Sequence, residues 1–185
     1  IECGALGGSD FEKVATAIAT METLPITIDD RTGLSVPDMR RACRRQQREG
    51  GLDQVVIDYV QLIPGTLERR GANRNEEITH ISRSLKELAG ELRVPIHLLS
   101  QLSRASTKRY DPRPKLEDLR ESGALEQDAD CVLLLHRRNH LVGGKTEGIM
   151  GKQRNGPGGS VFLDLDRDTL TFTDAPPQEP DPDPE

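Results

Sequence analysis

Short runs of apolar residues alternate along the chain with segments in which apolar residues recur every three or four positions. The runs at 55–63, 96–100 and 131–135 predict buried strands, the first interrupted by one carboxylate. Helical spacing is most regular in one segment, at Ile78, Ile81, Leu85, Leu88 and Leu92. Strands separated by helices are typical of βαβ units, so the pattern predicts an α/β fold with a parallel central sheet.

Two further helices are predicted nearer the N-terminus. Ser9 and Glu12 have the spacing of a capping box, as do Ser35 and Asp38, and an apolar stripe follows each pair. The intervening segment 25–28 predicts a strand. The second helix carries five arginines, at Arg40, Arg41, Arg44, Arg45 and Arg48.

The C-terminal third has a different pattern. Segments 147–151, 160–165 and 169–172 predict shorter strands, and the last two are close enough to form an antiparallel hairpin that closes the sheet. Residues 174–185 are rich in proline and acidic residues and have too few apolar groups to offset the entropy of ordering. We therefore predict one domain at 1–173 and a disordered tail at 174–185.

Composition narrows the class of protein. The chain has 185 residues and a net charge of −6, and most of this charge comes from the tail, so the body is nearly neutral and nucleic-acid binding is not excluded. Three widely spaced cysteines favour reduced thiols over a disulfide framework. No apolar stretch has the roughly 20 residues that span a bilayer. We expect a cytoplasmic protein without a membrane partner.

Polar residues follow three of the predicted strands. Asp58, Gln101 and Lys152 each fall where a strand ends, and ligands of open parallel sheets bind beyond the carboxyl ends of strands. An aspartate there is suited to holding hydrated Mg²⁺, and a glutamine could hydrogen-bond a terminal phosphate or an attacking water. The alternatives are that Asp58 caps a neighbouring helix and that Gln101 is a routine turn residue.

Two glycine-containing segments carry candidate anion-binding groups. Lys152 and Arg154 lie among glycines at 151–159, which suits an anion-binding loop or cations offered to another subunit's nucleotide, although an ordinary hairpin turn has the same composition. Arg120 and Gly123 could bind a phosphate backbone, because glycine permits close approach. A solvated loop is the alternative for this second segment.

A phosphate-binding loop is not found in the sequence. The segment 143–146 imitates the end of a Gly-x-x-x-x-Gly-Lys-Ser/Thr motif, but Asn139 replaces its first glycine, and a strand rather than a helix follows. His136 and His140 are spaced for zinc on a helix, but they lack further ligands, which favours solvent-exposed side chains.

Several motifs in order resemble the replicative DNA helicases of the DnaB type, from about Phe11 to Phe172. They are Leu-Pro-Ile-Thr-Ile-Asp-Asp, the arginine-rich helix, Val-Ile-Asp-Tyr-Val-Gln-Leu-Ile, Ile-Ser-Arg-Ser-Leu-Lys-Glu-Leu-Ala, Ser-Gln-Leu-Ser-Arg, Asp-Leu-Arg-Glu-Ser-Gly-Ala-Leu-Glu-Gln-Asp-Ala-Asp and Gly-Lys-Gln-Arg-Asn-Gly-Pro. The resemblance implies a RecA-like ATPase core with an antiparallel C-terminal edge, incomplete because the P-loop strand and helix are absent.

The resemblance also implies catalytic roles for four residues. Asp58 is the Walker B carboxylate, which holds Mg²⁺ through water, and Gln101 senses the terminal phosphate of ATP. Lys152 and Arg154 match cations that act on the nucleotide of the neighbouring subunit, which makes a ring of six copies a requirement of the chemistry.

Three more residues, Arg120, Glu121 and Gly123, match the central-channel loop that holds single-stranded DNA by its phosphates. The resemblance implies a helicase that moves on this strand and unwinds duplex at the replication fork, with a primase and a helicase loader as partners of the complete protein. We expect its P-loop and catalytic glutamate upstream of Ile1, and therefore little activity from this chain alone. The alternatives are an inactive remnant that still binds a ring or DNA, and another RecA-like ATPase.

Overall fold

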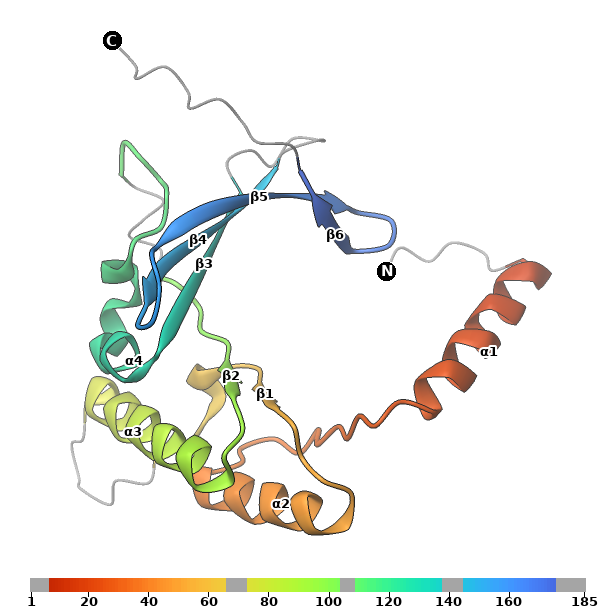
Figure 1. The fold of residues 1–185 in the computed structure, drawn as a ribbon, viewed down its shortest axis with the longest axis horizontal. Helices are drawn as coiled ribbons and strands as arrows, with labels where there is room; N and C mark the ends of the chain where they lie inside the picture. Colours follow the sequence, from red (N-terminus) through yellow and green to blue (C-terminus); the bar gives the residue numbers. More distant parts are fainter. Residues whose placement is uncertain (1–6, 66–72, 104–108, 138–144, 176–185) are drawn as a thin grey trace. The chain divides into compact units, whose positions relative to one another are not determined.

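The structure is a computed structural model that describes residues 7–65, 73–103, 109–137 and 145–175. Contacts divide the chain into two units, 1–32 and 33–185. The elements are α1 (Gly8–Glu22), α2 (Val36–Glu49), β1 (Val55–Ile57), η1 (Val60–Leu62), α3 (Arg74–Leu92), β2 (Ile96–Leu98), η3 (Leu116–Ser122), α4 (Gly123–Asp128), β3 (Cys131–Arg137), β4 (Thr146–Gln153), β5 (Gly159–Asp166) and β6 (Thr171–Asp174) (Figure 1).

The first unit contains one exposed helix. The main-chain N–H of Gly7 donates to Asp10 Oδ2 at 3.0 Å, so α1 begins ahead of the predicted Ser9 cap. The strand predicted at 25–28 is wrong: these residues are irregular, and Ile26 is 65% exposed. A β-prone sequence forms a stable strand only when another strand pairs with it, and no described residue does so here.

The core of the second unit lies between two helices and the short parallel sheet. All five apolar residues that set the predicted spacing of α3 are buried, which confirms that helix. The capping box of α2 is confirmed as well, because Ser35 N–H donates to Asp38 Oδ2 at 3.1 Å and Asp38 N–H donates to Ser35 Oγ at 3.4 Å. Arg44 of α2 then pairs with Glu91 of α3.

Strands β1 and β2 pair in parallel, with Ile57 opposite Leu98. The prediction of a fully buried first strand was wrong, since Ile57 is 8% exposed but Val56 is 60% exposed. The described residues pack against one face of this pair only, and the apolar run after Asp58 turns into η1, where Val60 is fully buried.

The C-terminal third forms a separate antiparallel sheet in the order β3-β4-β5-β6. The predicted hairpin is confirmed, and Asp166 accepts the N–H of Asp168 at 2.9 Å in its turn. The run at 131–135 was wrongly predicted to be buried in the parallel sheet: it belongs to β3, in which Leu134 is 4% exposed and Leu133 56% exposed.

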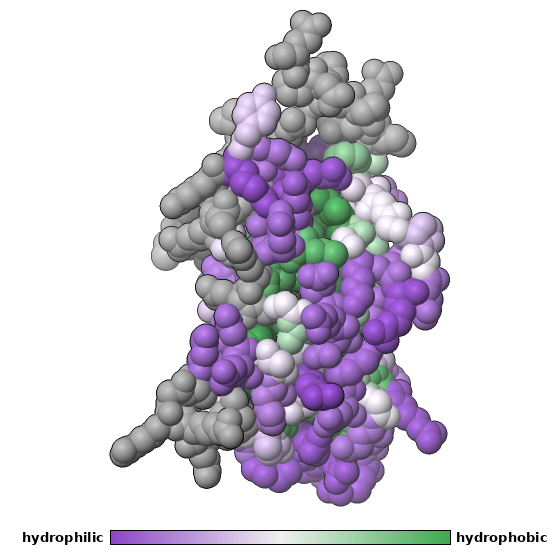
Figure 2. Space-filling model, turned by 90° about the vertical axis from the view of Figure 1, so that its left-hand side faces the viewer, coloured by the Kyte–Doolittle hydropathy of each residue, from purple (hydrophilic) through white to green (hydrophobic). Residues whose placement is uncertain are grey.

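On the face seen in Figure 2, polar residues predominate among the described residues and surround an apolar patch. No helix in the described parts of the chain is long and apolar enough to cross a membrane. The predicted disordered tail falls almost wholly on 176–185, outside the described residues.

Candidate nucleotide and DNA site

Asp58 and Gln101 lie beyond the carboxyl ends of the two parallel strands. Asp58 follows β1 directly, and Gln101 stands three residues after β2. The pairing continues past the strand ends, because Leu99 N–H donates to Ile57 O and Val60 N–H donates to Leu99 O, both at 3.0 Å. The structure therefore brings these two predicted residues to one edge of the sheet.

Gln61 is a residue of this edge that sequence reasoning missed. Its side-chain amide donates to Ser100 Oγ at 3.2 Å and to Gln101 O at 3.3 Å, while its Oε1 accepts the N–H of Gln101 at 3.4 Å. Arg74 donates in turn to Gln61 O at 2.9 Å. Gln61 thus fixes the main chain of Gln101, and its only signal in the sequence is a polar side chain within an apolar run.

The surroundings of Asp58 fit a hydrated magnesium ion. Its side chain is exposed, and no described residue donates a hydrogen bond to it, so both carboxylate oxygens can accept from metal-bound water. Nowhere in the described ranges do three His, Cys, Asp or Glu side chains gather as a metal cage. Magnesium in nucleotide sites is usually held by one or two carboxylates together with water and phosphate oxygens, which agrees with a single aspartate.

Lys152 does not lie at this edge. It belongs to β4 of the antiparallel sheet, so the prediction that it follows a parallel strand beside Asp58 and Gln101 is wrong. Its ammonium donates to the main-chain carbonyls of Glu126 and Gln127, the second at 3.1 Å, at the end of α4. A cation at this position satisfies carbonyls that the helix itself leaves unpaired.

Arg154 follows β4 and contacts Asp130. Like Gln61, Asp130 is a residue of the site that sequence reasoning missed. The guanidinium donates to Asp130 Oδ1 at 3.1 Å, and the main-chain N–H of Arg154 donates to Asp130 O at 2.8 Å. Lys86 of α3 pairs with the other carboxylate oxygen. The Lys86 hydrogen bond and the charges of Lys86, Arg154 and Lys152 hold the pKa of Asp130 below its ordinary value.

The predicted DNA-contacting segment joins η3 to α4. Arg120 and Glu121 lie in η3, and their side chains are outside the described part of the structure. Gly123 begins α4 with an ordinary helical φ of −51°, and a Cβ added there would meet no described atom within 4 Å outside its own stretch of chain. The fold itself therefore does not require glycine at this position.

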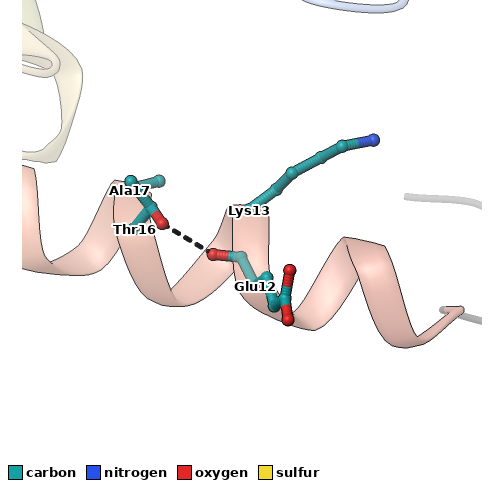
Figure 3. A pocket seen from close by; sticks show the side chains of 4 residues that line it. All are labelled: Glu12, Lys13, Thr16 and Ala17. Atoms are coloured by element: carbon teal, nitrogen blue, oxygen red, sulfur yellow. Dashed lines mark hydrogen bonds between the residues drawn. The ribbon is translucent and has the colours of Figure 1, made fainter.

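Other candidates from the sequence do not form sites. Residues 143–144 of the P-loop imitation lie outside the described structure, and the predicted strand after them is confirmed as β4. His136 is in a strand rather than a helix, and His140 lies outside the described residues. The described residues that line a shallow hollow along α1 all belong to that helix (Figure 3): Glu12, Lys13, Thr16 and Ala17.

Residues 1–174 match the family model of the DnaB-like helicase C-terminal domain. The chain belongs to this family. It is 45% identical over 168 residues to the replicative DNA helicase DnaB of Geobacillus stearothermophilus and 44% identical over 169 residues to the replicative DNA helicase DnaC of Bacillus subtilis. Each alignment covers 88% of this chain and 37% of the relative, so the chain spans little more than a third of their length.

Solved structures agree with this DnaB-like assignment. One solved ATPase domain superposes with a TM-score of 0.84 at 36% identity, covering 93% of this chain and 62% of that one. A DnaB-like replicative helicase, described with its interactions with primase, gives 0.85 at 35% identity over 95% of this chain and 45% of that one. The predicted RecA-like α/β fold, with a parallel sheet and an antiparallel sheet at its C-terminal side, is confirmed.

Proposed function

We propose that this DnaB-like chain is the C-terminal part of the motor of an ATP-driven replicative helicase, which moves along single-stranded DNA and unwinds duplex at the replication fork. Family membership supports the class of enzyme. The observation that carries the assignment to these residues is the pairing of β1 with β2, which sets Asp58 and Gln101 at one sheet edge, where Gln61 bonds to Gln101.

At this edge, Asp58 would hold Mg²⁺ through water, and the bound ion would supply positive charge to the phosphates of ATP. Gln101 reads the terminal phosphate by a hydrogen bond from its side-chain amide, and Gln61 keeps the main chain of Gln101 in place. These residues position and sense the nucleotide, since phosphoryl transfer depends mainly on orientation and charge stabilisation.

Lys152 and Arg154 stabilise charge that develops on the nucleotide of the next subunit in a homohexameric ring. Contacts with Asp130 hold Arg154 at the end of β4, which supports this role. Lys152 serves first to fasten α4, which begins at the DNA-contacting residue Gly123.

Arg120 binds the phosphate backbone of the single strand in the central channel through its guanidinium, and Glu121 and Gly123 bind it through main-chain N–H groups. Phosphate contacts set position without reading sequence, so movement along DNA is sequence-tolerant. The open space around a Cβ at Gly123 leaves room for the strand. The complete cytoplasmic protein binds a primase and a helicase loader. Because these 185 residues include no P-loop motif, we expect the chain alone to hydrolyse little ATP.

The test is Arg154→Ala in the full-length helicase. Hydrolysis should fall by about three orders of magnitude or more, the size typical of arginine fingers, while nucleotide affinity changes little, because the finger acts on a neighbour's ATP. Arg83→Ala is a matched control, since Arg83 is an exposed arginine of α3. Normal turnover by the Arg154 variant would refute the assignment.

A further inference from the structure

We propose that an ion pair between Arg109 and Asp118, here called the clamp, positions the DNA-contacting segment 120–123. The inference rests on the proposed function and adds two residues to it. Asp118 stands two positions before Arg120 in η3, and Arg109 precedes that helix. Both are positioning residues, because they act through the segment rather than on DNA.

Asp118 is the most deeply buried carboxylate among the described residues, with only 4% exposed. Burial of a charged carboxylate is costly unless other groups pair with it, and here two groups do so. Arg109 Nη2 donates to Oδ2 of Asp118, and the main-chain N–H of Lys115 donates to the same oxygen at 2.8 Å. The clamp and the Lys115 N–H together therefore hold Asp118 near the start of η3.

Arg109 also fastens the chain between itself and η3. Its Nη2 donates to the carbonyl of Arg113 at 3.2 Å, whereas its contact with Glu117 Oε1 at 3.1 Å is exposed to solvent and contributes little. The Arg113 side chain then reaches β4 and β5, with Nε donating to Glu147 Oε2 at 3.1 Å and Nη2 donating to Ser160 Oγ at 2.9 Å. These contacts fix the segment ahead of Arg120 to the antiparallel sheet.

The main chain of Asp118 extends the connection to the nucleotide edge. Its carbonyl accepts the N–H of Ser103 at 3.0 Å, and Ser103 is two residues after Gln101. Asp118 is thus held by Arg109 through its side chain and bonded to Ser103, just after Gln101, through its main chain. The clamp fixes the point at which the segment after β2 meets the DNA-contacting segment.

A positioning role has a measurable signature. Without the clamp, the phosphate contacts can still form, but part of the free energy of DNA binding is used to order segment 120–123. Because ordering one residue costs about 1–2 kcal/mol, and every 1.4 kcal/mol is tenfold, affinity should fall by about 5- to 30-fold. The number of counterions released stays the same, so the slope of log affinity against log salt should not change.

The experiment measures binding of a fluorescent oligothymidylate to the full-length helicase, saturated with a non-hydrolysable ATP analogue, over a series of salt concentrations. Asp118→Asn should weaken binding at every salt concentration with an unchanged slope and unchanged nucleotide affinity. Glu117→Gln is the matched control, because it removes the charge of the other carboxylate partner of Arg109. The Glu117 side chain is 68% exposed, so this variant should behave as the parent.

Arg109→Lys decides the matter if Asp118→Asn does not assemble. Lysine keeps the positive charge but lacks the several N–H donors of the guanidinium. The variant should therefore bind single-stranded DNA more weakly than the parent, with the same slope of log affinity against log salt. Parent-like affinity in the assembled variant would overturn the clamp, and so would a reduced slope, because the loss of affinity would then come from lost phosphate contacts and not from looser positioning. Arg120→Ala separates the two claims: if it leaves affinity and slope unchanged, the proposed DNA site fails, whatever the clamp variants do.

Discussion

Ser82 offers a quantitative test of how α3 supports the site, because its hydroxyl joins α3 to α4. Oγ donates to Asp128 Oδ2 at 2.6 Å and lies 3.4 Å from the carbonyl oxygen of Ala124, and Ser82 is only 4% exposed. Replacement by alanine removes the donor and leaves the carboxylate of Asp128 with one partner fewer. Since α4 also holds Lys152, this contact stabilises the region between the DNA-contacting segment and the cations.

The magnitude follows from two opposing effects. A hydrogen bond to a charged group contributes about 1.5–3 kcal/mol, and Asp128 is half-buried, so water replaces part of it and the loss should lie near the lower end. Alanine favours a helix over serine by about 0.5 kcal/mol. Ser82→Ala should therefore lower the free energy of unfolding by about 1 kcal/mol.

Urea denaturation followed by circular dichroism measures this change, with Ser84→Ala as the control. Ser84 lies on the same helix, is half-buried and makes no hydrogen bond through its side chain to the described residues, so its replacement should stabilise by a few tenths of a kcal/mol. Equal effects of the two substitutions would refute the reasoning, because they would show that the contact with Asp128 adds nothing.

Three further changes have defined outcomes. Gly123→Ala should raise thermal stability slightly, because glycine disfavours helix and the added Cβ meets no atom, yet a titration should show weaker binding of single-stranded DNA. Gln61→Ala in the full-length helicase should slow hydrolysis about tenfold or more at little cost in nucleotide affinity, measured as kcat against Kd, because Gln101 loses its support. Lys86→Met should raise the pKa of Asp130 towards its ordinary value, as measured by NMR titration of its carboxyl carbon. In the parent, the lowered pKa of Asp130 stabilises the fold at pH values above the ordinary pKa, and this stabilisation is lost as pH falls through the lowered pKa.

The sequence predicted those parts of the fold that depend on local pattern. The spacing of apolar residues in α3 requires only that one helix face be buried, and the capping box of α2 lies within four residues of chain. The apolar runs before Asp58 and Gln101 likewise predicted a parallel pair and the edge where both residues lie. The first two features depend on interactions that are close in sequence, whereas the strand pair was predicted from two separate apolar runs.

Other features depend on partners far apart in the chain. An apolar run at 131–135 is compatible with either sheet, and only its antiparallel pairing with β4 placed Lys152 away from Asp58. Gln61 is a routine polar residue until β2 brings Gln101 beside it, 40 positions later. The same holds for Asp130, whose partners lie 44 positions before it and 24 positions after it.

The most direct test of the account mixes two inactive full-length helicases. Asp58→Ala subunits cannot use their own nucleotide but still offer Arg154, whereas Arg154→Ala subunits have the opposite defect. In rings assembled at random from equal amounts, about a quarter of the interfaces combine an intact Asp58 with an intact Arg154 from the next subunit. The account predicts that ATP hydrolysis, absent from either variant alone, reappears on mixing, and assembled mixed rings that remain inactive would contradict it.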